Sequence, residues 1–427
     1  MKTTELKKYI ENGALDTRLR ALYGEAAADA QRARYLKAVA SFAALYGERD
    51  GVRLFSVPGR SELSGNHTDH NHGCVIAASI NLDIIAVAAP TIDGAVHIYS
   101  EGYGENTVVL AEYSAPRAAL FGKSEALIAG MCTGMAKAGY QTGGFVAYTT
   151  SSVLKGSGLS SSAAFEVMVG NIENHLYNGG AVDNIEIAKI AQYAENEFFG
   201  KPCGLMDQSA CAVGGIIAID FADNTAPVIE KIDFDITAAG YHLCIVNTGG
   251  NHADLTPDYT AIPAEMKAVA AALGKQVLRE VDETALITAI PALRKQVGDR
   301  AILRALHFFG ENRRVAEQKQ ALRAGNLDTF FQMVVASGRS SFCYLQNVYT
   351  TENVAEQGLS LALILAERAL ADKSAAWRVH GGGFAGTVQA FVPAAEAERF
   401  RTMMDAVFGT NACMVLRVRA EGATTLL

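Results

Sequence analysis

The sequence predicts an α+β protein of two domains, and two observations lead to this prediction. Apolar, β-branched runs typical of strands and longer amphipathic runs typical of helices follow one another in irregular order. A doubly wound parallel sheet would instead show strict alternation of strand and helix. The chain has 427 residues, 50% of them hydrophobic, which is enough for more than one core. We expect an N-terminal mixed α/β domain over residues 1–240 and a second domain over 241–427.

The first half is expected to begin with helices and to continue into a sheet. Apolar positions recur at helical spacing over residues 4–48, and the pattern changes to that of a strand at Val52. We expect Pro58 and Gly59 to end this strand at residue 57. Further strands are expected at 75–89, 96–99, 107–110 and 145–149, and helices at 124–138, 163–177 and 183–199.

The second half is expected to be mainly helical, with strands at both of its ends. Strands are indicated at 214–220 and 241–247, and residues 261–375 alternate apolar and charged positions in the manner of helices. The end of the chain, residues 377–427, has the pattern of a strand, a glycine turn, a strand, a helix and a strand.

Composition excludes several classes of function. A net charge of −8 gives no basic excess to neutralise the phosphates of a nucleic acid, so no nucleic-acid partner is expected. Polar residues interrupt the long apolar run at 75–90, and the first ten residues lack a signal-peptide core, so no membrane partner is expected. The seven cysteines include no Cys-x-x-Cys pair, which favours reduced thiols and a cytoplasmic protein. We expect a monomer or a weak homo-oligomer.

The strongest chemical signal is a stretch of glycines and serines at 153–164, between an expected strand and an expected helix. Glycines let backbone N–H groups approach an anion, and the positive end of the helix dipole points to the same place. A nucleotide phosphate fits this arrangement, although the loop lacks the Gly-Lys-Ser/Thr ending of a Walker A motif. An ordinary serine-capped helix after a glycine turn is an equally good interpretation of this segment alone.

A second signal is the polar segment 58–73, which is longer than a hairpin turn requires. Its mixed donors and acceptors suit a sugar, which carries hydroxyls on every side. Three histidines with Asp69 could also suggest a metal site, but polar loops readily hold solvated histidines.

Two further segments are ambiguous when taken singly. Asp207 is an isolated acid in an apolar run after a helix stop at 200–202, and it is either a helix cap or a functional carboxylate. Three consecutive glycines at 381–383 indicate either a close backbone approach to a ligand or a plain turn.

Together these segments resemble the GHMP kinases, and within them the galactokinases, from about residue 52 to the C-terminus. The family motif Gly-Arg-x-Asn-Leu-Ile-Gly-Glu-His-Thr-Asp-Tyr-x-x-Gly aligns with 59–73, and the phosphate loop Gly-x-Gly-Leu-Ser-Ser-Ser-Ala aligns with 156–163. The Ala-Glu-His and Pro-Cys-Gly-Ile-Met-Asp-Gln motifs align onto 194–208, and the glycine-rich motif matches 381–386. The resemblance implies a two-domain fold with a ferredoxin-like C-terminal domain and the active site between the domains.

The resemblance implies a role for each matching residue in transfer of phosphate from ATP to a sugar, D-galactose first. Asp207 would lie near the anomeric hydroxyl, with Arg60 between it and the γ-phosphate. Mg²⁺ would be held by Ser162 and Glu195. The phosphates would be bound by Gly156, Ser157, Gly158, Leu159, Ser160 and Ser161. The sugar would be bound by Asn66, His67, Asp69, Gly204 and Tyr259.

Departures from the family motifs concentrate on the sugar side. The family's Asn is Glu62 here, its Ile is Ser64, its Glu is Asn66 and its Tyr is His70. An Arg usual in a later motif is Asn251, and the Pro before the phosphate loop is Leu154. The phosphate machinery matches, whereas the exact sugar stays open.

Two alternatives to a D-galactose kinase therefore remain at the level of the sequence. A kinase for L-arabinose, 6-deoxygalactose or N-acetylgalactosamine would need a similar site. A non-catalytic sugar sensor would resemble the same family but have a shortened phosphate loop, and the loop here is full length.

Overall fold

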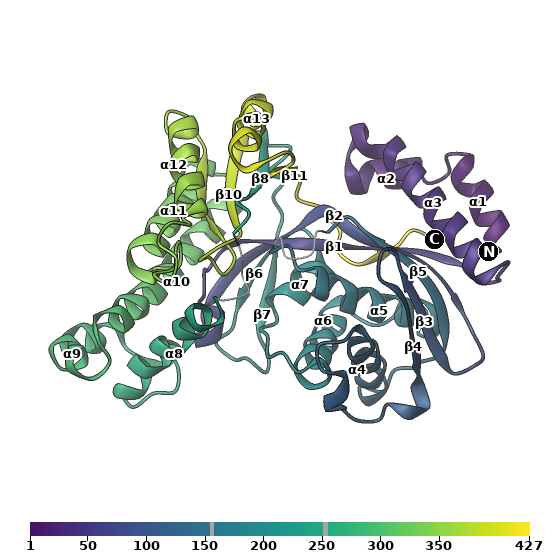
Figure 1. The fold of residues 1–427 in the computed structure, drawn as a ribbon, viewed down its shortest axis with the longest axis horizontal. Coiled ribbons are helices and arrows are strands. Elements are labelled where there is room, and N and C mark those ends of the chain that lie inside the picture. The colour runs from purple at the N-terminus through teal and green to yellow at the C-terminus, as the bar shows by residue number, and fades with distance from the viewer. Residues whose placement is uncertain (154–157, 251–254) are drawn as a thin grey trace.

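The computed structural model describes residues 1–153, 158–250 and 255–427, and it has two halves that are each built around a sheet (Figure 1). The expected α+β class is confirmed. Long strands β1 (Arg53–Ser64) and β2 (Cys74–Pro90) form the centre of the first half. Both termini lie at the same end of the molecule, beside α1 (Thr3–Glu11).

The first sheet has eight strands, in the order β12-β1-β2-β5-β3-β4, with β6 and β7 added beside β2. Strands β3 and β5 pair in parallel, and the other pairs are antiparallel. The remaining strands are β3 (Ala95–Ser100), β4 (Gly104–Val109), β5 (Phe145–Ser151), β6 (Ile216–Asp220), β7 (Val228–Ile232) and β12 (Thr424–Thr425).

Helices cover both faces of this sheet, which explains the nearly continuous apolar run of β2. Successive side chains of a strand point to opposite faces. Val87 and its alternate neighbours join the core under α1, α2 (Asp16–Tyr23) and α3 (Ala28–Tyr46). Ala86 and its alternate neighbours join the core under the second group of helices. That group is α4 (Ser124–Lys137), α5 (Ser161–Tyr177), α6 (Asn184–Tyr193) and α7 (Met206–Val213).

The prediction that Pro58 and Gly59 end the first strand is wrong. β1 continues to Ser64, with irregularities of register between Pro58 and Arg60 and between Glu62 and Ser64. A bulge accepts proline because no ladder hydrogen bond is needed from that residue. The backbone N–H of Arg60 instead donates to the carbonyl oxygen of Leu159 at 3.1 Å, so the bulge turns β1 toward the glycine and serine loop.

The second sheet has four antiparallel strands in the order β11-β8-β10-β9. This is the strand order of a ferredoxin-like sheet, as the family resemblance implied. The strands are β8 (Tyr241–Asn247), β9 (Ala376–His380), β10 (Thr387–Pro393) and β11 (Cys413–Leu416). The helices of this half are α8 (Thr256–Ala272), α9 (Glu283–Gln296), α10 (Asp299–Arg323), α11 (Leu327–Ser340), α12 (Gly358–Leu370) and α13 (Ala397–Phe408).

The two halves share a hydrophobic core. Ile76 of β2 and Ile216 of β6 lie in one buried cluster with Leu243 of β8 and Phe330 of α11. Strand β12 also returns the end of the chain to the first sheet, where Thr425 pairs with Phe55. The division at residue 240 stays a prediction.

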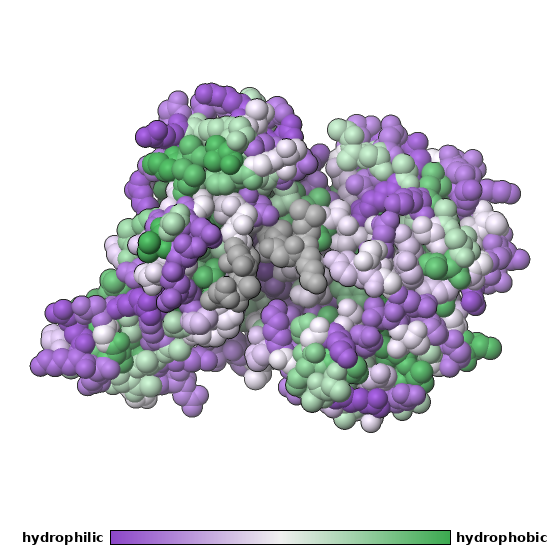
Figure 2. Space-filling model, in the orientation of Figure 1, coloured by the Kyte–Doolittle hydropathy of each residue, from purple (hydrophilic) through white to green (hydrophobic). Residues whose placement is uncertain are grey.

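The surface in this orientation is mainly hydrophilic, with a hydrophobic patch over α12 (Figure 2). Leu361 and Ile364 of α12 are among the exposed large hydrophobic side chains. Within the described residues, no helix is long and apolar enough to cross a membrane. All seven cysteines are described, and each is free of a disulfide. The oligomeric state stays a prediction.

Candidate active site

An arginine–aspartate pair joins β1 to the start of α7. Arg60 donates from Nε to Asp207 Oδ1 at 2.7 Å and from Nη2 to Asp207 Oδ2 at 2.8 Å. This bidentate geometry fixes the plane of the carboxylate. Asp207 lies in the first turn of α7, where a carboxylate also suits the helix dipole. Its side chain keeps 31% exposure, so the pair faces an open space.

The same arginine holds the described part of the glycine and serine loop. Arg60 Nη1 donates to the carbonyl oxygen of Gly158, and the hydroxyl of Ser160 donates to Asp207 Oδ2. Gly158 and Ser160 both have left-handed backbone, with φ of 71° and 60°. α5 begins directly after them at Ser161, so the positive end of a 17-residue helix faces the pair.

These contacts decide the charge state of Asp207. Burial on its own raises the pKa of this carboxyl, but the charge and hydrogen bonds of Arg60 and the hydrogen bond of Ser160 outweigh it. The pKa of Asp207 is therefore lowered, and its carboxylate is ionised at neutral pH. Asp207 is thus a weak base in the resting site.

A second cluster of carboxylates lies beside the pair. Glu195 is 2% exposed, and its two oxygens accept from Lys201 Nζ at 3.0 Å and from Gln208 Nε2 at 2.8 Å. Gln208 Nε2 also lies 3.2 Å from Oε2 of the buried Glu166. Glu166 Oε1 is buried and accepts no hydrogen bond from the described residues. Ser162 lies four residues before Glu166 and thus on the same face of α5.

A third group of polar residues comes from the segment between β1 and β2. A Cβ atom at Gly204 would lie 2.9 Å from Asp69 Oδ2, so Asp69 and the Gly204 backbone are in direct contact. His67 Nε2 lies 2.9 Å from the carbonyl oxygen of Gly382. Burial lowers the pKa of His67 to about 4, so this imidazole is neutral at pH 7.

Tyr259 of α8 closes the group from the other half of the molecule. Its hydroxyl donates to the carbonyl oxygen of Gly383 at 2.8 Å, and burial raises its pKa to about 12. A Cβ atom at Gly382 would lie 2.6 Å from the Tyr259 ring. The glycines between β9 and β10 thus allow Tyr259 and His67 to approach the same turn.

Asn66 does not face this space. It is 0% exposed, and its Nδ2 donates to Gly381 O at 2.7 Å and to Glu62 Oε1 at 3.2 Å. Its Oδ1 accepts from Asn347 Nδ2 at 2.9 Å and from Ser341 Oγ at 3.2 Å. With both donors and both acceptor positions occupied, the Asn66 side chain has no polar atom left for a sugar. Its expected sugar contact is corrected here to a structural role.

The structure thus brings most of the expected residues together. Arg60, Asp207, Gly158, Ser160 and the start of α5 form one group. Asp69 contacts Gly204, three residues before Asp207, and His67 and Tyr259 meet at the turn of Gly382 and Gly383. Gly156 and Ser157 lie outside the described residues, as do Leu154 and Asn251. Leu159 is fully buried and contributes its backbone, which accepts the Arg60 N–H.

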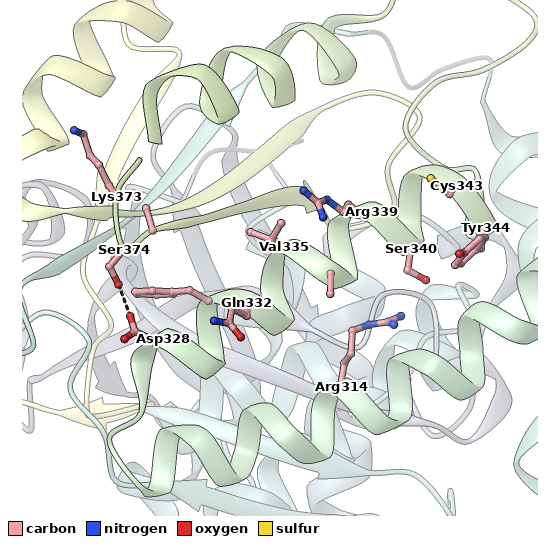
Figure 3. A pocket seen from close by; sticks show the side chains of 13 residues that line it. Arg314, Asp328, Gln332, Val335, Arg339, Ser340, Cys343, Tyr344, Lys373 and Ser374 are labelled. Carbon is pink, nitrogen blue, oxygen red and sulfur yellow. Dashed lines mark hydrogen bonds between the residues drawn. The ribbon is translucent and has the colours of Figure 1, made fainter. Parts of the chain in front are cut away.

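A separate pocket of about 740 Å³ lies along α11 (Figure 3). Arg314, Arg339 and Lys373 are among the residues that line it, and Asp328 accepts there from the Ser374 hydroxyl at 2.8 Å. None of the expected site residues lines this pocket.

Comparison of the sequence with known proteins identifies the family of this chain. Residues 126–215 match the model of the GHMP kinases N terminal domain, and residues 40–90 match the galactokinase galactose-binding signature. The galactokinase of Streptomyces coelicolor is 30% identical over 88% of this chain and 94% of its own length. Human galactokinase is 30% identical over 87% of this chain and 91% of its own length. The chain belongs to the galactokinase family.

Solved structures agree with membership of the galactokinase family. The crystal structure of Lactococcus lactis galactokinase complexed with galactose superposes with a TM-score of 0.75 at 27% identity. The match covers 90% of this chain and 98% of that chain. A mevalonate kinase structure, at 14% identity and a TM-score of 0.60, shares the fold. The family transfers phosphate to a hydroxyl, so the enzyme class predicted from the sequence is confirmed.

Sequence reasoning missed several members of the site. Gln208 lies inside the quoted Met-Asp-Gln motif, yet no role was assigned to it. Glu166 could have been found as one of two acids, with Glu173, on the buried face of a largely apolar helix. Lys201 was noted only as part of a helix stop, and no local pattern indicates that its ammonium reaches Glu195.

Proposed function

We propose that this galactokinase-family chain uses ATP to phosphorylate D-galactose at its anomeric hydroxyl, giving galactose 1-phosphate. The observation that carries the proposal is the Arg60–Asp207 pair, fixed by two hydrogen bonds beside Gly158 and the first turn of α5. A carboxylate and an arginine at the positive end of a helix provide a proton acceptor and charge stabilisation where phosphate would bind.

Asp207 accepts the proton of the reacting hydroxyl in this proposal. Its lowered pKa makes it a weak base in the resting state, because Arg60 and Ser160 stabilise its charge. Proton transfer therefore accompanies the build-up of negative charge on the phosphate, when Arg60 turns part of its interaction toward that charge. Phosphoryl transfer requires mainly positioning and charge neutralisation, and Arg60 contributes to both.

Ser162 and Glu195 are the residues that we propose as ligands of Mg²⁺. The surroundings fit a hard cation, because the buried Glu166 Oε1 accepts no hydrogen bond from the described residues and Glu195 is 2% exposed. When bound, Mg²⁺ would offset the negative charge of the phosphates. Lys201 reaches Glu195 in the present structure, so this carboxylate already accepts a cation.

His67, Asp69, the backbone of Gly204 and Tyr259 are the residues that we propose around the sugar. Asp69 has 19% side-chain exposure and offers acceptors, and the neutral His67 bonds the Gly382 carbonyl and so holds the turn above the space. We also infer a reducing compartment, the cytoplasm, because all seven cysteines are free of disulfides.

The test is ATP consumption by the purified chain with a panel of sugars, together with identification of the phosphorylated carbon. The expected result is turnover with D-galactose and a 1-phosphate product. A higher kcat/KM with L-arabinose, 6-deoxygalactose or N-acetylgalactosamine would reassign the substrate within the class. Galactose binding by calorimetry without ATP consumption would contradict the kinase function and indicate a sensor.

A further inference from the structure

The space around Asp69 and Asp207 contains a carboxylate that the proposed function has not used. Glu62 lies on β1 two residues after Arg60, and it is 6% exposed. Its Oε1 accepts from Arg378 Nη2 at 2.8 Å and from Asn66 Nδ2 at 3.2 Å. Its Oε2 accepts no hydrogen bond from the described residues, and it is not among their fully enclosed, unpartnered atoms.

Glu62 is held rigidly by buried neighbours. Arg378 is 0% exposed, and its other donors bond the carbonyl oxygens of Leu63 and Val379. Asn66 is fixed by four hydrogen bonds and cannot turn away. Both partners therefore determine where Glu62 Oε2 points, and a bound molecule meets a preorganised acceptor.

The charged groups around Glu62 are those of the candidate active site. The pKa of Glu62 is raised, because burial outweighs the charges of Arg378 and Arg60, and Asp69 raises it further; the hydrogen bond from Arg378 Nη2 stabilises the ionised form. Arg60 and Glu62 lie two residues apart on a stretch of β1 that pairs regularly with β2, so their side chains point to the same face of the sheet. Glu62 Oε2 thus lies on the substrate side of β1.

We propose that Glu62 supplies the acidic acceptor that selects one hydroxyl of the sugar, with Asn66 and Arg378 as the residues that position it. The inference rests on the proposed function, because it names the residue that accepts a hydrogen bond from one hydroxyl of the proposed sugar substrate. A hydrogen bond from a neutral hydroxyl to an ionised carboxylate is about twice as strong as one between neutral groups. A sugar that lacks this hydroxyl leaves Glu62 Oε2 desolvated and unpaired, so it should be rejected.

The test compares galactose with its 2-, 3-, 4- and 6-deoxy derivatives. Affinities are measured by calorimetry, and kcat/KM is measured for the wild type and Glu62→Gln. In the wild type, one deoxy sugar should be at least about tenfold weaker than galactose through loss of the Glu62 contact. In Glu62→Gln the penalty for that sugar should fall to about two- or threefold, and the penalties for the other three should stay unchanged.

Two further variants keep the experiment decisive. Glu62→Gln could fail to fold because Arg378 loses its ionic partner, and its thermal unfolding shows whether it does. Glu62→Asp keeps the charge beside Arg378 but withdraws the carboxylate by one methylene, and it should lose the same selectivity. Glu173→Gln changes a buried carboxyl three turns along α5 and should keep the wild-type pattern.

The outcomes separate the inference from the proposed function. If both Glu62 variants discriminate against the deoxy sugars as the wild type does, the inference is overturned. The proposal of galactose phosphorylation is unaffected by that result. If the Glu62 variants lose the affinity penalty for one deoxy sugar only, the inference is supported. If the chain at the same time consumes no ATP, only the kinase proposal fails. A chain that binds none of the five sugars overturns both.

Discussion

The charge state of Asp207 is determined by its contacts more than by its position on α7. Two hydrogen bonds from Arg60 and one from Ser160 stabilise its ionised form, so its pKa lies below the usual value. The same contacts orient the carboxylate toward the open side of the pair. An amide in its place would keep the shape but neither the charge nor the proton affinity.

Asp207→Asn should therefore reduce kcat strongly and leave ATP affinity largely unchanged. Loss of a positioned general base costs about 10²- to 10⁴-fold in rate. The measurements are steady-state kinetics and ATP titration by calorimetry. Asp220→Asn breaks another Arg–Asp pair, with Arg279 at 2.9 Å, outside the site and should keep wild-type rates. Wild-type turnover in Asp207→Asn would remove this residue from the mechanism.

Glu195→Gln should raise the Mg²⁺ concentration needed for half-maximal activity and for tight binding of ATP. Replacing even an outer partner of a metal site costs 10- to 100-fold in affinity, so loss of a direct ligand should cost at least about tenfold. Calorimetry of ATP at several Mg²⁺ concentrations measures this shift without turnover. Glu197→Gln changes an exposed acid in the same helical segment and serves as the control. An unchanged Mg²⁺ dependence would leave Glu195 as a partner of Lys201 only.

The sequence predicted the role of a residue where a family motif keeps its spacing. It did not predict the role where long-range contacts decide which partners a side chain bonds. Asp207 and Arg60 lie far apart in the chain, and only the motif alignment related them. Asn66 occupies the position of a family glutamate, so the sequence predicted a sugar contact. The fold surrounds it instead with Glu62, Ser341, Asn347 and Gly381, and three of these come from the other half. No local pattern encodes that burial.

At the scale of secondary structure, hydrophobic periodicity predicted most helices and strands. The failure at β1 has a physical cause, because Pro58 and Gly59 act as breakers only where a strand needs regular pairing. The Arg60 N–H bonds the Leu159 carbonyl, and Arg378 bonds the Leu63 carbonyl, so contacts from outside the sheet support the bulged strand. Such long-range partners are invisible in a local window.

The start of α5 depends on a glycine in left-handed backbone, and Gly158→Val tests this element. Gly158 has φ of 71°, which costs other residues about 1–2 kcal/mol, and β-branched residues suffer most. Among the described residues, an added Cβ meets only ordinary contacts, such as His380 at 3.6 Å, so we expect the harm to come from the backbone. The loop should rearrange and ATP affinity should fall by at least tenfold, as measured by calorimetry.

Gly139→Val is the matched control for this change. Gly139 also has positive φ, at 89°, and apart from its chain neighbours no described residue has an atom within 4 Å of its added Cβ. The two variants should therefore lose similar stability in urea unfolding, while only Gly158→Val loses ATP affinity. Equal ATP affinity in both variants would mean that the phosphates bind elsewhere.

At the scale of the whole molecule, each sheet is formed mainly by one half of the chain. The two halves are nevertheless stabilised together, because contacts join them. The shared core between β2, β6, β8 and α11 and the return of β12 to β1 connect the halves. Both are contacts between residues hundreds of positions apart, which periodicity cannot predict. The polar interruption at Asp83 in the apolar run of β2 is the site of another such connection.

Asp83 links three distant parts of the chain within the first sheet. It is 0% exposed, and Arg34 of α3 donates to its Oδ1 at 2.6 Å. Arg419, from the segment before β12, lies 3.3 Å from its Oδ2, and Tyr23 and Ser56 also donate to that oxygen. Burial raises the pKa of Asp83, but the two arginines and the hydroxyl donors outweigh it, so the pKa is lowered.

Asp83→Asn should accordingly destabilise the protein by about 3–5 kcal/mol, because it leaves Arg34 and the fully buried Arg419 without their common counter-ion. The measurement is urea unfolding of the variant and the wild type as a function of pH. An aspartate with a lowered pKa in the folded state contributes stability above its unfolded pKa of about 3.9. That contribution is lost as the pH falls through the folded pKa, because the wild-type carboxyl then becomes neutral too. The difference between the two proteins in free energy of unfolding should thus be full at pH 7 and shrink below a pH of about 4.

Asp29→Asn, at a side chain with 91% exposure, should change stability little at any pH. A pH-independent loss in Asp83→Asn would show that packing, and not the buried charge, connects the N-terminal helices and the C-terminal segment to the sheet.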